Sequence, residues 1–195
     1  MIKNVDVTLL LASQSPRRRA LLKELGFPVK IVQPPNVDEV FPKYLKGGDI
    51  PVYLSQLKAE AYNELIPDNC ILVTADTIVW INNEVIGKPE NREDAIEMLK
   101  KLSDNKHQVF TGVCLKYKGV SHLFCDETSV YFRKLSDDEI SYYVDEYKPF
   151  DKAGAYGVQE WIGFIGVERI DGSYFNVMGL PTHRIYSEIL RLIAS

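Results

Sequence analysis

The feature that most constrains the fold is a nearly continuous apolar run at residues 71–81. A short run of this kind, rich in β-branched residues, is typical of a strand buried in the centre of a sheet. Asn82 and Asn83 follow as a turn signal, so we predict a hairpin that returns through residues 84–86. One carboxylate, Asp76, interrupts the run. A buried carboxylate is costly unless it binds a metal, a cation or several donors, although pairing with a buried arginine or capping a turn would also satisfy it.

Strand and helix signals alternate along the rest of the chain. Short apolar or alternating segments predict strands at residues 7–12, 108–117, 122–135 and 164–170. Helical spacing and capping signals predict helices from Pro16 to Gly26, at 54–65, after Asn91, after the capping box that begins at Ser136, and at about 181–193. This alternation predicts an α/β fold with a mixed, largely buried β-sheet flanked by helices.

The chain of 195 residues contains no repeat, low-complexity tract or flexible linker. It is long enough to bury a sizeable core as one unit. We therefore expect a single domain over residues 1–195, with residues 1–6 as a short tail and room for two lobes around a central cleft.

Charge and composition exclude several classes of protein. A formal net charge of −4 argues against non-specific binding to nucleic acid or to an anionic membrane. The apolar stretch that follows residues 1–6 is too short for a signal peptide or a membrane span, so a cytoplasmic protein is expected. The three cysteines show no metal-binding spacing, which favours reduced residues in or near the core.

Residues 13–19, with the sequence SQSPRRR, lie between a predicted strand and a predicted helix. Serine hydroxyls, free N–H groups at a helix N-terminus and guanidinium groups together favour an anion or phosphate, with Ser13, Arg17 and Arg18 as candidate ligands. The alternative is a capped helix with a solvated basic first turn. That arrangement would oppose the helix macrodipole unless an anion offset it. The Walker pattern is absent, which argues against P-loop chemistry.

Two lysines occur in structured places. Lys58 lies about 40° around its predicted helix from Leu54, at the edge of the buried stripe, where it could serve a site or simply extend its ammonium to solvent. Lys88 lies on the turn after the predicted hairpin, and a turn lysine alone means little.

Residues 151–160 contain two glycines with small neighbours, which would let the backbone approach a ligand closely. Lys152 and Gln159 could then offer a charge and an amide, although a plain glycine-rich connector has the same composition. Glu39 lies in an acidic loop that could equally be solvated.

With these residues in view, the chain resembles the Maf family of nucleotide pyrophosphatases, whose fold is related to that of inosine triphosphatase. The resemblance runs from about Thr8 to Leu192, and its motifs occur in family order. They are residues 11–19 (LASQSPRRR), 37–39 (VDE), 58–59 (KA), 75–77 (ADT), 87–89 (GKP), 111–112 (TG), 151–159 (DKAGAYGVQ) and 177–181 (VMGLP).

The resemblance implies hydrolysis of a nucleoside triphosphate between the α and β phosphates. It makes Asp76 the general base and places Mg²⁺ or Mn²⁺ on Glu39 and Asp76. Such a metal would activate water and neutralise the leaving pyrophosphate. Phosphate charge would be stabilised by Arg18, Lys58 and Lys88.

Three positions resemble the branch of the family that prefers dTTP and UTP: Arg17, Thr77 and Gln159. The branch that acts on 7-methyl-GTP tends to carry tryptophan, glutamine and glutamate there. Removal of modified pyrimidine triphosphates and a homodimeric state follow by analogy. The main departure is residues 160–162 (EWI), which are bulkier than the usual glycine-rich continuation and could reshape the base pocket.

Two other functions remain open at this point. One is a non-catalytic nucleotide-binding regulator of cell division, and the other is a pyrophosphatase for deaminated purines such as ITP or XTP. Metal-dependent release of pyrophosphate would exclude the first, and preference for UTP over ITP would exclude the second.

Overall fold

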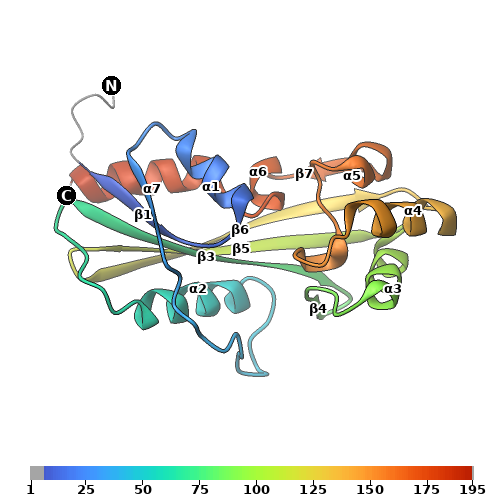
Figure 1. Ribbon diagram of the computed structural model, residues 1–195, viewed down its shortest axis with the longest axis horizontal. Coiled ribbons are helices and arrows are strands. Elements are labelled where there is room, and N and C mark those ends of the chain that lie inside the picture. Colours follow the sequence, from blue (N-terminus) through green and yellow to red (C-terminus); the bar gives the residue numbers. More distant parts are fainter. Residues whose placement is uncertain (1–6, 195) are drawn as a thin grey trace. The chain divides into compact units, whose positions relative to one another are not determined.

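The computed structural model describes residues 7–194, so the tail predicted for residues 1–6 lies outside the described range. The chain forms a seven-stranded sheet in the order β2-β1-β3-β5-β6-β7, with β4 paired to β3 (Figure 1). The sheet is mixed, because β1 is parallel to β2 and β3 whereas β4 and β7 pair antiparallel. The expectation of an α/β fold with a mixed sheet and flanking helices is confirmed.

By its internal contacts the chain divides into two compact units. Unit 1 comprises Met1–Asp76, Thr111–Asp126 and Gly179–Ser195, and unit 2 comprises Thr77–Phe110 and Glu127–Met178. Each unit is described by itself, and the single-domain organisation stays a prediction.

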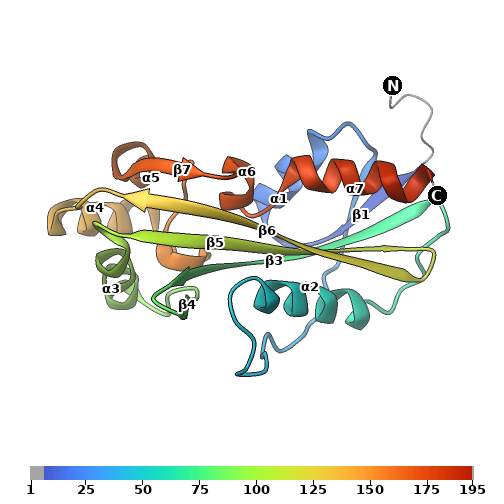
Figure 2. The same ribbon diagram turned by 180° about the vertical axis from the view of Figure 1, so that it is seen from behind.

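Unit 1 contains the parallel edge of the sheet and three helices. Its elements are β1 (Thr8–Ala12), α1 (Pro16–Lys23), β2 (Val29–Val32), α2 (Asp49–Ala61), α7 (Thr182–Ala194), the first part of β3 (Cys70–Ile81), the last part of β5 (Lys106–Tyr117) and the first part of β6 (Val120–Phe132). In this unit α1 and α7 lie on one face of the sheet and α2 lies on the other (Figures 1 and 2). Both faces of the sheet are therefore covered here, which explains the continuous apolar runs.

Helix α2 differs from its prediction at both ends. It begins at Asp49 and not at residue 54, because Pro51 lies in the first turn, where a missing N–H has no intrahelical acceptor to lose. It ends at Ala61 because Tyr62 adopts an extended conformation. Leu65, which the helical spacing had included, is 90% exposed.

Close packing of α2 on the sheet depends on Gly112 in β5. A Cβ atom at this position would lie 2.2 Å from the backbone carbonyl of Pro51. No real side chain tolerates such a distance, so the glycine of the threonine-glycine motif is needed for the approach of strand and helix.

Unit 2 contains the antiparallel part of the sheet. Its elements are the remainder of β3, β5 and β6 together with β4 (Glu84–Ile86), α3 (Arg92–Leu102), α4 (Asp137–Tyr147), the 3₁₀ turn η2 (Ala153–Ala155), α5 (Trp161–Gly166), β7 (Val167–Asp171) and α6 (Tyr174–Val177). Positive φ values of 52° and 62° at Asn82 and Asn83 confirm the predicted hairpin turn. The predicted cap Asn91 and the capping box of Ser136 and Glu139 are also confirmed.

The strand predicted for residues 164–170 was partly wrong. Residues up to Gly166 form the short helix α5, and the strand begins at Val167. A short apolar run has no periodicity that separates a buried helix from a buried strand. Here the strand begins at Val167, the residue that pairs with Phe132 of β6, and in the preceding helix Gly163 packs against the backbone of Val158, 1.9 Å from where its Cβ would be. The half-exposed edge strand β2 was not predicted at all.

The core of unit 2 lies between α3, α4 and the sheet. It includes Ala95, Leu99 and Leu102 from α3, Ile140, Tyr143 and Val144 from α4, and Val79, Ile81, Val109 and Val130 from the strands. His107 is buried in this core, where its Nε2 atom lies 2.8 Å from the Tyr156 hydroxyl. Desolvation by burial lowers the pKa of His107 to about 3, so the imidazole is neutral in the folded protein.

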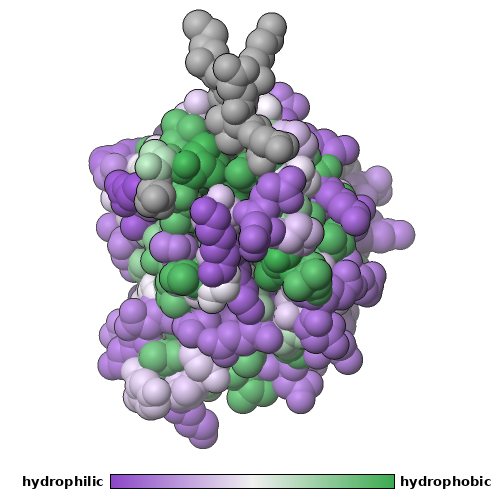
Figure 3. Space-filling model, turned by 90° about the vertical axis from the view of Figure 1, so that its left-hand side faces the viewer, coloured by the Kyte–Doolittle hydropathy of each residue, from purple (hydrophilic) through white to green (hydrophobic). Residues whose placement is uncertain are grey.

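The face of the molecule in Figure 3 is mainly hydrophilic, and its visible hydrophobic side chains form separate patches. Within residues 7–194, no helix combines the length and the apolar character needed to cross a membrane.

Candidate active site

The centre of the candidate site in unit 1 is the side chain of Lys58, in the last turn of α2. Its Nζ atom lies 2.6 Å from Oδ1 of Asp76 on β3 and 2.8 Å from Oε1 of Glu39. The side chains of Lys58 and Asp76 are only 15% and 11% exposed, whereas Glu39 is 48% exposed. One ammonium therefore brings together both carboxylates that the resemblance assigns to metal binding.

Helix α2 is held against β3 next to this cluster. The buried hydroxyl of Thr74 donates to the carbonyl oxygen of Ser55, at 2.7 Å. Because Thr74 and Asp76 are two residues apart on one strand, both can face α2. This bond fixes the helix and strand from which Lys58 and Asp76 extend.

Arg18 joins three of the sequence motifs. Its Nε donates to the carbonyl oxygen of Gly179, at 2.9 Å, and its Nη1 donates to that of Ala75, at 2.8 Å. Burial lowers the pKa of Arg18, and Asp76 opposes that shift, Arg17 adds to it and Glu39 opposes it. Arg18 is thus an inward-facing cation that interacts electrostatically with Asp76, and it is not part of a freely solvated first turn.

The remaining residues of the first motif shape the start of α1. The buried Ser13 hydroxyl accepts the N–H of Ser15, at 3.2 Å, and Ser15 in turn caps the helix by accepting the N–H of Arg18. Arg17 is half-buried, and the first turn of α1 contains no acidic side chain. Phosphate binding by Ser13 and Arg17 stays a prediction.

In unit 2 the structure brings together two motifs that are far apart in the sequence. The N–H of Gly154 donates to the carbonyl oxygen of Gly87, at 2.9 Å, which joins the turn of Lys88 to residues 151–160. Gly154 has a φ of 72°, and a Cβ there would lie 2.9 Å from Cγ2 of Val79. Glycine is needed here for both reasons. Lys88 is exposed.

Lys152 is buried and lies between two carboxylates of the same segment. Its Nζ atom is 2.8 Å from Oδ1 of Asp151 and 3.1 Å from Oε1 of Glu160. Gln159 lies beside them, with its Nε2 atom 2.9 Å from where a Cβ of Gly157 would be. Its Oε1 atom is buried and has no hydrogen-bond partner among the described residues. Binding of a ligand by Gln159 stays a prediction.

Sequence reasoning missed the part played by Tyr143. The sequence predicted only a helix after Ser136, but the Tyr143 hydroxyl donates to Oε2 of Glu160 and accepts the N–H of Gly157, at 3.0 Å. The available signal was Glu160, a carboxylate within the bulky residues 160–162 of the sequence. Thr77, also predicted for the site, is the half-buried first residue of unit 2.

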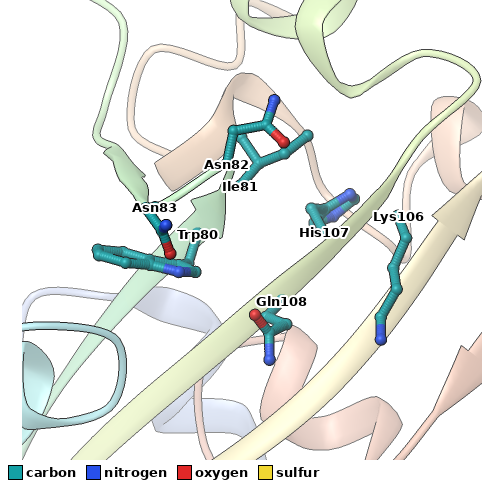
Figure 4. Close-up of a pocket in the computed structure, with 7 residues that line it drawn as sticks. All are labelled: Trp80, Ile81, Asn82, Asn83, Lys106, His107 and Gln108. Carbon is teal, nitrogen blue, oxygen red and sulfur yellow. The ribbon is translucent and has the colours of Figure 1, made fainter.

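A pocket of about 260 Å³ in unit 2 contains none of the predicted site residues (Figure 4). It lies where the β3–β4 turn faces the start of β5, and is lined by Trp80, Ile81, Asn82, Asn83, Lys106, His107 and Gln108. Its volume is below the usual range for small-molecule sites, about 300–1,000 Å³. We assign no role to it.

Comparison with known proteins agrees with the motifs and the fold. Residues 8–192 match the family described as "Maf-like protein". The chain belongs to the Maf family. It is 51% identical to a dTTP/UTP pyrophosphatase of Bacteroides thetaiotaomicron, over 98% of this chain and 100% of the relative. It is 45% identical to a dTTP/UTP pyrophosphatase of Porphyromonas gingivalis, over 93% of this chain and 92% of the relative.

The fold of this Maf-family chain is similar to that of a solved HAM1 protein from Coxiella burnetii. The TM-score is 0.53 at 13% sequence identity, and the match covers 95% of this chain and 99% of the other. At this identity the likeness concerns the fold alone. The predicted membership of the Maf family and the predicted α/β fold are both confirmed.

Proposed function

We propose that this protein is a nucleoside triphosphate pyrophosphatase that hydrolyses dTTP and UTP to the monophosphate and pyrophosphate. The observation that carries the proposal is the cluster in which Lys58 bridges Asp76 and Glu39 with Arg18 close by. The names of relatives that are 45–51% identical over nearly their whole length support the same reaction.

Within unit 1, we assign to Asp76 the activation of the water molecule that attacks the phosphate chain. Its carboxylate would orient the water and take its proton, which is the usual work of a general base. Lys58 and Arg18 supply fixed positive charge for the oxygens on which negative charge develops. Because these cations are held by neighbouring carboxylates and carbonyls, little reorganisation is needed when substrate binds.

The residues of the cluster fit a divalent cation, Mg²⁺ or Mn²⁺. Asp76 and Glu39 already direct carboxylate oxygens at one positive centre, the Lys58 ammonium. Among residues 7–194 no group of three or more His, Cys, Asp or Glu side chains could hold a metal. Two carboxylates suffice for Mg²⁺, which usually takes its other ligands from water and substrate phosphates. When bound, the metal would lower the pKa of a water molecule and neutralise the leaving pyrophosphate.

For unit 2 we propose that Lys88 and Lys152 bind phosphate oxygens and that Thr77 and Gln159 contribute to substrate choice. In unit 1, Ser13 would add a contact to phosphate, and Arg17 would contribute to phosphate binding and to substrate choice. The buried Oε1 atom of Gln159 can accept the N3–H group of uracil or thymine. Cytosine has no hydrogen on N3, so the same oxygen would disfavour it.

Modified pyrimidine triphosphates are further candidate substrates, and removing them would be a house-cleaning role. A homodimeric assembly is proposed from the family resemblance alone, and a cytoplasmic location stays a prediction of the sequence. The net charge of −4 argues against nucleic acid as a partner.

Pyrophosphate release from dTTP, UTP, CTP, GTP, ATP and ITP, each with Mg²⁺, Mn²⁺ or EDTA, tests the proposal. We expect strong metal-dependent release from dTTP and UTP. Greater activity on ITP would favour a purine pyrophosphatase. If no triphosphate releases pyrophosphate but nucleotide binding is retained, a non-catalytic regulator would be favoured.

A further inference from the structure

Three side chains of unit 2 form a continuous polar network behind the proposed ligand residues. The Tyr143 hydroxyl donates to Oε2 of Glu160, and Oε1 of the same carboxylate lies 3.1 Å from Nζ of Lys152. Tyr143 also accepts the N–H of Gly157, at 3.0 Å. One phenol therefore holds both the backbone and a side chain of the segment that carries Lys152 and Gln159.

The anchor of this network is rigid. Tyr143 is fully buried in the core of unit 2 and stacks on Tyr147 of the same helix, with ring centroids 5.1 Å apart. It belongs to the same core cluster as Leu99 and Leu102 of helix α3. The hydroxyl is therefore a fixed point against which residues 157–160 are held.

The network places the ammonium of Lys152 by charge as well as by packing. Lys152 is 9% exposed, and such a cation needs opposite charge close by. Asp151 provides one carboxylate, but that side chain is 56% exposed. Glu160 is only 20% exposed, and its second oxygen is fixed by Tyr143. Glu160 is therefore the better-held of the two counter-ions.

Gly157 shows how closely the segment folds over itself. A Cβ there would lie 2.7 Å from Cδ of Glu160 and 2.9 Å from Nε2 of Gln159. The same few atoms thus set the positions of Glu160 and Gln159. A shift of Glu160 would therefore change its ion pair with Lys152 and the space around Gln159.

We propose that Tyr143 and Glu160 are positioning residues, which hold Lys152 and Gln159 in place for the triphosphate without touching it. The inference rests on the proposed function, since it assumes that Lys152 binds substrate. It assigns a purpose to Glu160, the first of the bulky residues 160–162.

The test is a double-mutant cycle on the whole protein, with KM and kcat measured for UTP. Tyr143→Phe keeps the ring in the core and removes only the hydroxyl. Loss of a hydrogen bond to a charged group should raise KM about five- to tenfold and leave kcat within about twofold. Tyr147→Phe removes a neighbouring hydroxyl outside the network and should leave both constants unchanged. In a Lys152→Ala background, Tyr143→Phe should have a clearly smaller effect on KM, because only the positioning of Gln159 is left to lose.

A KM for Tyr143→Phe within about twofold of the wild type would overturn the inference, as would an equally large effect in the Lys152→Ala background. If Tyr143→Phe does not fold, Glu160→Gln takes its place in the cycle with the same expected outcomes. If the wild type hydrolyses UTP but Tyr143→Phe leaves KM unchanged, only this inference fails and the proposed function stands. If Lys152→Ala itself leaves KM unchanged, the phosphate-binding role of Lys152 fails, and the inference fails with it.

Discussion

The ammonium of Lys58 lies 2.6 Å from Oδ1 of Asp76, in a pair that is almost completely buried. Such pairs add little net stability, because the cost of removing two charges from water offsets their attraction. We therefore interpret the pair as functional. Glu39 completes it from a more exposed position, with 48% of its side chain exposed.

Replacement of Asp76 by asparagine should abolish most turnover while keeping the fold. The amide keeps the size of the side chain and can still accept from Lys58, but it cannot take a proton from water. We expect kcat to fall by roughly 10²–10⁴-fold, the usual contribution of a general base. Pyrophosphate release measures the loss, circular dichroism checks the fold, and the exposed Asp68→Asn is the matched control. A kcat close to that of the wild type would remove Asp76 from the mechanism.

Gly112→Ala should destabilise the protein strongly. The added methyl group would lie 2.2 Å from the backbone of Pro51, so α2 or β5 must move. We expect the free energy of unfolding to fall by about 3 kcal/mol or more. Gly87→Ala is the control, because nothing lies within 4 Å of its added Cβ, and it should change stability by less than about 1 kcal/mol. Urea denaturation measures the stability of both variants. Equal unfolding midpoints would contradict the close contact between Gly112 and the backbone of Pro51.

Gln159→Glu should weaken the preference for uracil over cytosine. Both side chains can accept the N3–H of uracil, but only the carboxamide can also donate to the O4 atom, whereas an ionised carboxylate would repel O4 and accept from the N4 amino group of cytosine. Loss of one hydrogen bond predicts a change of about fivefold in the ratio of kcat/KM for UTP to that for CTP. Gln33→Glu adds the same charge on an exposed loop and should leave the ratio as it was. An unaltered ranking in Gln159→Glu would separate this residue from base recognition.

Stability should fall with decreasing pH because of His107. Its pKa is about 3 in the folded protein and 6.5 in the unfolded chain, so below pH 6.5 the unfolded state binds a proton that the native state does not. The contribution of neutral His107 is complete above pH 6.5 and is lost towards pH 3, by about 1.4 kcal/mol for each pH unit.

His107→Gln removes the titrating group and keeps a partner for the Tyr156 hydroxyl. Urea denaturation between pH 7 and pH 4 should therefore show a shallower pH dependence for this variant than for the wild type. His183→Gln, on an exposed position of α7, should keep the wild-type dependence. Parallel curves for His107→Gln and the wild type would show that His107 does not titrate as its burial requires.

Local signals were enough to predict most of the elements. Capping by Asn91, the capping box at Ser136 and the Asn82-Asn83 turn each depend on residues within a few positions, so a local pattern contains the whole cause. The boundary at Val167 and the length of α2 were not local. The boundary depends on the pairing of Val167 with Phe132 of β6, and the length of α2 depends on which apolar residues find a partner in the core.

The sequence by itself determined the family, the α/β class and the residue types of the site, because motifs and periodicity are properties of the chain. It also marked Asp76 as a buried carboxylate that needs a metal, a cation or several donors. Only the tertiary structure decided that this cation is Lys58, that Arg18 bonds to Ala75 and Gly179, and that Tyr143 holds Glu160. These partners are far apart along the chain, and hydrogen bonds and ion pairs act over a few ångströms in space, whatever the separation in sequence.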